Sequence, residues 1–241
     1  EPVTVGYDIY SPQGKLLEFN MQEVTIPGRS TDTVRFTPFI YGTNANKWEP
    51  GAKNPPLYKV MLFTRRDGAY REYMPLKIGF GKTELVDGRL TRFDKELKLV
   101  KAGYNAAADR KTTLAELKTL KAKGNNTICP DYPQPGWFYD LCDELGLYVI
   151  DCANINAPEK RDDRKVGGTP SNDPSLADEY LERVKAMYYR SRNHSCVIAF
   201  ALGGESGNGY NMYKAYEWLK SVEKSRPVIC ADADGEWNSD L

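Results

Sequence analysis

Among the residues of this chain, Glu205 lies in the sequence segment that most strongly indicates a catalytic or ligand-binding role. It lies in the glycine-rich segment ALGGESGNG (201–209), directly after the β-branched and aromatic run CVIAF (196–200). This pattern predicts a buried parallel strand whose carboxyl end opens into a loop. In barrels of alternating strands and helices such loops build the active site, so we expect Glu205 to touch a ligand. The alternative is a loop glutamate that caps the next helix or faces water.

Polar residues also follow other expected strands. Asp131 comes directly after the apolar segment 126–129, and Trp237 lies in an acidic loop after segment 227–231. Sugar hydroxyls bond to carboxylates while the apolar face of a sugar stacks on an indole, so these residue types suit sugar recognition. A solvated acidic loop is the alternative. The carboxylates of this loop are Asp232, Asp234 and Glu236.

Strands and helices alternate from about Leu97 onward, which predicts a parallel sheet with right-handed crossovers. We expect about five strands and four helices, whereas a closed barrel has eight of each in roughly 250 residues. Either the native protein continues past Leu241, or another chain supplies the second half. The expected strands are 97–101, 126–129, 147–152, 197–202 and 227–231, and the expected helices are 113–123, 136–145, 174–189 and 210–224.

The first third of the chain has a different pattern. Short alternating segments are separated by turn residues such as Asp67 and Gly68, which is typical of an immunoglobulin-like β-sandwich with a scaffolding role. We therefore place two domains at residues 1–82 and 83–241. The expected strands of the sandwich are 3–10, 24–26, 33–36, 58–64 and 70–78.

Composition narrows the function classes. Basic and acidic side chains number 33 each, which argues against a general nucleic-acid or polyanion binder. The sequence shows no signal peptide and no apolar run of the roughly 18 to 20 residues that a membrane span needs, so the compartment stays open. The five cysteines have no CxxC spacing, and we expect them to be buried free thiols.

Several blocks of the sequence resemble glycoside hydrolase family 2, the β-galactosidase and β-glucuronidase family. Residues 192–209, RNHSCVIAFALGGESGNG, are similar to its acid/base motif R-N-H-P-S-V-I-x-W-S-L-G-N-E-S-G-x-G. Residues 138–151, FYDLCDELGLYVID, are similar to a helix and strand of its barrel, and WEPGAKNPPLY (48–58) to its W-x-P-x-N-P-x-L-Y turn. The blocks occur in the family's order along nearly the whole chain.

The resemblance implies a fold and a reaction. The fold is an all-β immunoglobulin-like sandwich followed by an incomplete (β/α)8 TIM barrel, and the reaction is retaining hydrolysis of β-linked galactosides or similar sugars. Such enzymes use two carboxyl groups about 5 Å apart, an acid/base and a nucleophile. Glu205 matches the acid/base, whose pKa must be raised to act as an acid. The family's nucleophile is a later glutamate that this chain does not reach, so we expect the chain alone to be inactive.

The matched positions also show departures from the family. After the first strand, K-G-x-N-R-H-E becomes KAGYNAAA (101–108), which keeps Asn105 but loses the basic, imidazole and acidic groups. Asp131 stands where the family has a histidine, and Gly204 replaces an asparagine that contacts the sugar 2-hydroxyl. Two family residues that help to hold magnesium are here Asn156 and Pro158, so we expect no metal and no cofactor.

Two interpretations follow from these matches and departures. In the first, the chain belongs to a glycosidase in which Glu205 acts as acid/base and Asn105, Asp131 and Trp237 bind the β-linked sugar. In the second, it is a catalytically inactive carbohydrate-binding or scaffolding module. In either case the exposed barrel edges require the rest of the barrel or a homo-oligomer to cover them. The only histidine, His194, precedes a strand at the opposite end of the barrel, and we expect it to be structural.

Overall fold

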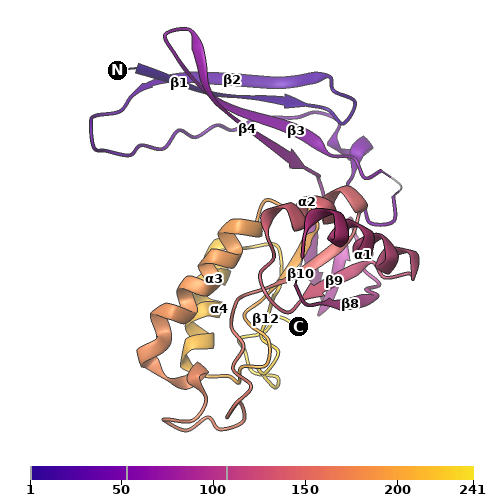
Figure 1. Ribbon diagram of the computed structural model, residues 1–241, viewed down its shortest axis with the longest axis vertical. Helices are drawn as coiled ribbons and strands as arrows, with labels where there is room; N and C mark the ends of the chain where they lie inside the picture. The colour runs from indigo at the N-terminus through magenta and orange to yellow at the C-terminus, as the bar shows by residue number, and fades with distance from the viewer. Residues whose placement is uncertain (1, 53, 107) are drawn as a thin grey trace. The chain divides into compact units, whose positions relative to one another are not determined.

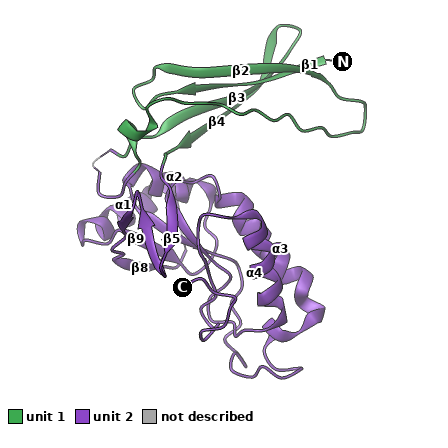
Figure 2. Cartoon of the chain, turned by 180° about the vertical axis from the view of Figure 1, so that it is seen from behind, with its two compact units in different colours: residues 1–48, 55–80 green, residues 49–54, 81–241 purple. Residues whose placement is uncertain are grey.

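The computed structural model describes residues 2–52, 54–106 and 108–241 of the chain (Figure 1). They form two compact units, one made of residues 1–48 and 55–80 and the other of residues 49–54 and 81–241 (Figure 2). Each unit has its own sheet and its own buried residues. No helix in the described ranges combines the length and the apolar character that crossing a membrane requires.

The first unit contains one four-stranded antiparallel sheet. Its strands are β1 (Pro2–Tyr10), β2 (Leu16–Thr25), β3 (Tyr58–Arg66) and β4 (Ala69–Ile78), in the order β2-β1-β3-β4. The hairpin between β3 and β4 turns at Asp67 and Gly68, which have φ values of 53° and 73°. Positive φ at both central residues fits the twist of a two-residue hairpin, which explains the Asp-Gly pair.

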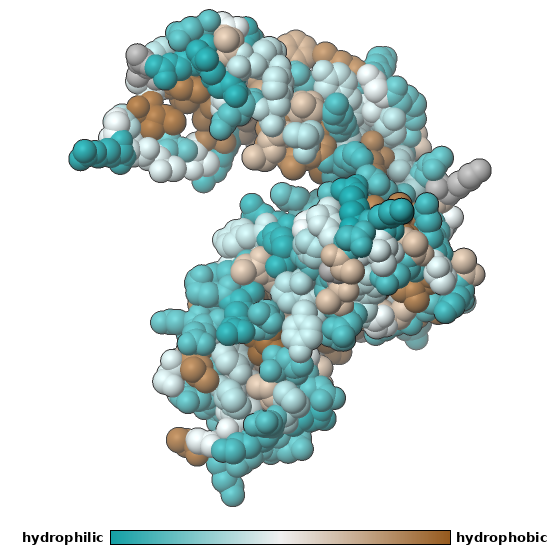
Figure 3. Space-filling model, in the orientation of Figure 1, coloured by the Kyte–Doolittle hydropathy of each residue, from teal (hydrophilic) through white to brown (hydrophobic). Residues whose placement is uncertain are grey.

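The second sheet of the expected sandwich is not formed by the described residues of this unit. The strand expected at 33–36 is wrong, because residues 31–40 contain no strand. A strand needs a neighbour to accept its backbone hydrogen bonds, and sequence alternation alone does not supply one. Phe36 of this segment instead packs edge-on against Tyr7, with ring centroids 5.1 Å apart. Figure 3 shows hydrophobic side chains at the surface of this unit. Phe19 and Phe39 are 63% and 68% exposed.

Three aromatic residues, Trp48, Tyr58 and Phe80, contribute to the packing of this unit. The side chain of Trp48 is completely buried, and a Cβ atom on Gly79 would lie 2.6 Å from it, so only glycine fits there. The Trp48 amide donates to the carbonyl of Phe80, whose ring packs edge-on against Tyr58 at 4.8 Å. The tryptophan of the family-like turn is therefore a packing residue.

The second unit is a partial TIM-barrel-like α/β domain, as the alternation predicts. Five parallel strands form its main sheet in the order β12-β11-β10-β9-β8. These strands are β8 (Lys101–Tyr104), β9 (Thr127–Pro130), β10 (Tyr148–Cys152), β11 (Val197–Ala201) and β12 (Val228–Ile229). The helices that alternate with them are α1 (Arg110–Ala122), α2 (Gly136–Leu145), α3 (Ala177–Ser191) and α4 (Tyr210–Val222).

Shorter elements complete this unit. A small antiparallel sheet, β5 (Thr83–Val86), β6 (Arg89–Arg92) and β7 (Lys95–Glu96), precedes the parallel strands. The expected helix start at Pro174 is a short 3-10 turn, η3 (Pro174–Leu176), and the α-helix begins at Ala177. The first expected strand lies four residues too early in the chain, since β8 starts at Lys101. The remaining short helices are η1 (Thr43–Asn46) and η2 (Pro170–Asn172).

All the parallel strands run in one direction, so the loops that follow them lie at one edge of the sheet. The strands β10 and β11 form the centre of the core, with Val149, Ile198 and Phe200 fully or almost fully buried. A rigid centre of this kind fixes where the following loops begin. The candidate site is made from the loops after β10, β11 and β12.

Candidate active site

The loop that carries Glu205 is bonded to the loop after β10. The carbonyl of Ile155 accepts the Gly204 amide at 2.9 Å and the Ser206 hydroxyl at 3.1 Å, and the Ala157 amide donates to the carbonyl of Glu205 at 2.9 Å. A Cβ atom on Gly203 would lie 2.8 Å from the Ile155 carbonyl oxygen, so this close approach requires glycine. Backbone bonds on both sides therefore hold the backbone of Glu205 in one place.

The Glu205 side chain points out of this rigid backbone. It is 68% exposed, and Oε1 lies 3.3 Å from Nη1 of Arg161. It does not cap the next helix, because α4 starts after Gly209 and its first amide, that of Tyr210, donates to Oδ1 of Asn172 at 3.0 Å. Of the alternatives that the sequence left open, the structure removes capping and leaves an accessible carboxylate with one arginine partner.

Asp232, in the loop after β12, fixes the other side of the Glu205 loop. Its Oδ2 accepts the backbone amides of Ser206 at 2.8 Å and Gly207 at 2.7 Å. Its Oδ1 lies 3.9 Å from Nη2 of Arg161, so one guanidinium contacts both carboxylates. The negative charges of two neighbours raise the pKa of Arg161 above its ordinary value. Asp232 has the larger effect and Glu205 the smaller one.

The charged segment 159–165 contacts the acidic loop after β12 through a second arginine. Arg164 pairs with Glu236, contacts Asp234 at 3.3 Å and donates to the carbonyl of Asp232 at 3.1 Å. The Tyr213 hydroxyl donates to Glu236 at 2.6 Å, and this bond together with Arg164 lowers the pKa of Glu236. Arg161 and Arg164 therefore attach this segment to the acidic loop after β12.

The three residues expected to bind sugar lie in separate surroundings. Asp131 is exposed directly after β9, and its amide donates to the Tyr104 carbonyl at 3.0 Å. Trp237 is 55% exposed and packs on Tyr213 at 5.3 Å, so one part of its indole is free to meet a ligand. Within the described ranges no hydrogen bond or ion pair joins either side chain to Glu205.

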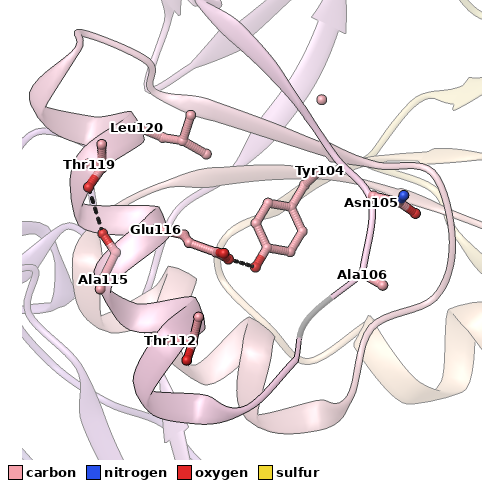
Figure 4. Close-up of a pocket in the computed structure, with 9 residues that line it drawn as sticks. Tyr104, Asn105, Ala106, Thr112, Ala115, Glu116, Thr119 and Leu120 are labelled. Carbon is pink, nitrogen blue, oxygen red and sulfur yellow. Dashed lines mark hydrogen bonds between the residues drawn. The ribbon is translucent and has the colours of Figure 1, made fainter.

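Asn105 lines a hollow of about 530 Å³ between β8 and α1. Inside it the Tyr104 hydroxyl donates to Glu116 at 2.5 Å, and the two side chains point toward one another (Figure 4). Burial and this bond raise the pKa of Tyr104 to about 12. Asn105 lies on the side of the hollow away from Glu116 (Figure 4). Its carbonyl accepts the Gln134 side-chain amide at 3.0 Å, and among the described residues no hydrogen bond or ion pair connects it to the Glu205 loop.

The sequence analysis did not identify Asn156 and Tyr132 as site residues. The Asn156 amide donates to the Tyr132 hydroxyl at 2.9 Å, which joins the loops after β10 and β9. Asn156 also lies close to Gly204, because a Cβ atom on that glycine would be 3.8 Å from its Oδ1. Tyr132 lies two residues after β9 and Asn156 four residues after β10, and this position after a strand is the signal that could have found them.

His194 precedes β11, whereas the loop that carries Glu205 follows that strand. Its Nδ1 and Oδ2 of Asp143 are 2.7 Å apart, and Asp143 Oδ1 accepts the Cys196 amide at 2.7 Å. The carboxylate is almost completely buried, so both of its oxygens are used to join α2 to the start of β11. This geometry gives the histidine a structural role.

Comparison with known proteins identifies the family. The profile described as "Glycosyl hydrolases family 2, TIM barrel domain" matches residues 103–240. The chain is 34% identical over 185 residues to a β-galactosidase of Vibrio cholerae and 36% identical over 190 residues to one of Lactococcus lactis. Each alignment covers 72% of this chain, which spans only 18% of the length of either relative.

Solved structures show the same fold at lower identity. A β-glucuronidase of Bacteroides uniformis is similar with a TM-score of 0.77 at 18% identity, over 95% of this chain and 29% of that one. A β-glycosidase of Bacteroides vulgatus gives a TM-score of 0.71 at 20% identity, over 98% of this chain and 30% of that one. From the matched barrel domain and the curated relatives, this chain belongs to glycoside hydrolase family 2.

Proposed function

We propose that this chain carries the acid/base part of the active site of a retaining, β-galactosidase-like glycosidase. The observation that supports it best is the place of Glu205. Its side chain is 68% exposed, while the backbone of its loop is bonded to the loops after β10 and β12. An acid/base catalyst has to be reachable by substrate and held in a fixed position, and Glu205 meets both requirements.

In the proposed reaction Glu205 transfers a proton to the glycosidic oxygen as the bond to the anomeric carbon breaks. The second carboxylate attacks that carbon, and Glu205 then takes a proton from the water that releases the sugar. We propose that a later barrel strand, outside these residues, supplies this nucleophile. Asn105, Asp131 and Trp237 are the proposed sugar-binding residues, and residues 1–82 are a proposed immunoglobulin-like sandwich domain beside the barrel part 83–241.

A second candidate function is an inactive carbohydrate-binding module. It is favoured by the loss of family carboxylates at positions such as Asn156 and by the partly free indole of Trp237. Binding by stacking and hydrogen bonds needs no acid catalyst. In this case Trp237→Ala would weaken sugar affinity and Glu205→Gln would leave it unchanged.

The test is hydrolysis of a panel of nitrophenyl β-glycosides by this chain and by the longest native form of the protein. Each is compared with its Glu205→Gln variant and with Glu217→Gln, a matched change of an exposed glutamate on α4 that pairs with Lys214. We expect activity in the longer form only, lost with Glu205→Gln and kept with Glu217→Gln. Silence of the folded longer form on every substrate would reject the glycosidase and favour the binding module.

A further inference from the structure

The positive charge beside Glu205 comes from the protein itself. Arg161 lies 3.3 Å from the Glu205 carboxylate and 3.9 Å from that of Asp232, and its side chain is 39% exposed. A Cβ atom on Gly207, whose φ is 68°, would lie 2.4 Å from the Arg161 carbonyl oxygen. The backbone of Arg161 therefore lies directly on the Glu205 loop, which limits how far its guanidinium can move from Glu205.

The residues near this guanidinium do not fit the magnesium ion that the family resemblance implies. That ion would need ligands from positions 156 and 158, but Pro158 has no side-chain donor. The Asn156 amide group is bonded to the Tyr132 hydroxyl, and its remaining oxygen carries no charge. Magnesium prefers carboxylate oxygens in octahedral geometry. Here the two nearest carboxylates, Glu205 and Asp232, already share a cation that would repel a second one.

We propose that the Arg161 guanidinium replaces the metal ion as the fixed positive charge beside Glu205, so that this site works without magnesium. The inference rests on the proposed function of Glu205. Arginine is a positioning residue in this scheme: it orients the carboxylate through one Nη group while the other is directed at Asp232. Asp232 is in turn fixed by two backbone amides, so the orientation is transmitted from the loop after β12.

The first experiment measures metal binding and needs no enzymatic activity. Mn²⁺, a paramagnetic substitute for Mg²⁺, is titrated into the chain while the amide signals of Glu205, Ser206 and Gly207 are followed by NMR. We expect no saturable broadening of these signals in the wild-type chain. The variant Asn156→Glu/Pro158→His/Arg161→Gln is expected to show it, provided that its spectrum confirms folding. Saturable broadening at Glu205 in the wild-type chain, reversed by excess Mg²⁺, would overturn the proposal.

The second experiment tests the role of the charge in the longest native form. We expect Arg161→Gln to lower kcat by about 10- to 100-fold with little change in KM, as for other residues that orient a catalytic group. Arg161→Lys, which keeps the charge, should recover much of the loss, and EDTA should not affect the wild-type rate. Inactivation by EDTA with recovery on adding Mg²⁺ would overturn the proposal, as would full activity of Arg161→Gln.

The two experiments separate this inference from the proposed function. If the wild-type longer form hydrolyses no glycoside, the proposed function fails, and the Mn²⁺ titration still decides whether a metal ion binds beside Glu205. If the wild-type form is active but requires magnesium, the proposed function stands and this inference fails.

Discussion

The carboxylate of Asp232 accepts the backbone amide of Ser206 at 2.8 Å, which joins the loop after β12 to the loop that carries Glu205. It also accepts the Gly207 amide and contacts Arg161. One side chain thus holds the backbone next to Glu205 and the cation that pairs with Glu205. The position of the proposed acid/base depends on a residue 27 positions further along the chain.

The first prediction concerns this attachment. Asp232→Ala should speed hydrogen exchange of the Ser206 and Gly207 amides by about 10- to 100-fold, because hydrogen bonds to charged groups contribute about 1.5–3 kcal/mol. Asp234→Ala is the matched control, since that side chain is largely exposed and contacts Arg164 instead. Equal exchange rates in the wild-type chain and Asp232→Ala would show that other contacts hold the loop.

The second prediction compares two adjacent glycines. Gly203→Ala should lower the free energy of unfolding by about 1–3 kcal/mol, because the new Cβ meets the Ile155 backbone at 2.8 Å. Gly204→Asn should change it by less than about 0.5 kcal/mol, because a Cβ there is 3.8 Å from its nearest neighbour. Urea unfolding measures both. A large decrease in the free energy of unfolding with Gly204→Asn would contradict the conclusion that there is room for a side chain beside Asn156.

A third prediction concerns the free thiols. Cys142 and Cys196 are fully buried and burial raises their pKa, while burial raises the pKa of Cys152 to about 12 and that of Cys230 to about 11. Only Cys129 is partly exposed. At neutral pH a thiol reagent should therefore modify Cys129 slowly and the other four only in denaturant. Rapid modification of two or more thiols in the folded chain would contradict this.

The fourth prediction is a pH dependence. The hydrogen bond from Tyr213 and the pairing with Arg164 lower the folded-state pKa of Glu236 below its unfolded value of roughly 4.3. A lowered pKa contributes stability above the unfolded value, and this stability is lost as the pH falls through the folded value. The Tm difference between the wild-type chain and Glu236→Gln should thus be larger at neutral pH than in acid. A difference that grows on acidification would contradict the sign.

The sequence predicted the regular parts of the barrel domain closely. Helix α2 occupies the expected residues 136–145, because Pro135 and the left-handed Gly146, with φ of 65°, mark its ends locally. The expected strand at 33–36 failed, because strand formation depends on a pairing partner that alternation does not reveal. Local signals thus fixed both ends of α2, whereas α3 begins three residues after the expected Pro174 and segment 33–36 found no pairing partner among the described residues.

The site was predictable only in part. Glu205 was predicted as the acid/base because it follows a strong apolar strand and lies in a segment similar to a family motif, and this role stays a prediction. Arg161 was not found, because it lies in an irregular loop and its partners Glu205 and Asp232 follow later strands. Asn105, Asp131 and Trp237 stay predictions as sugar-binding residues, since the described contacts do not connect them to Glu205.

The most direct test of Glu205 as acid/base is the dependence of kcat/KM on the leaving group in the longest native form. Phenyl β-glycosides need a proton on the departing oxygen, whereas dinitrophenyl glycosides leave without one. We predict that Glu205→Gln lowers kcat/KM by about 10²- to 10⁴-fold for the phenyl substrate and far less for the dinitrophenyl substrate. Equal losses for both substrates, or no loss for either, would contradict the assignment of Glu205.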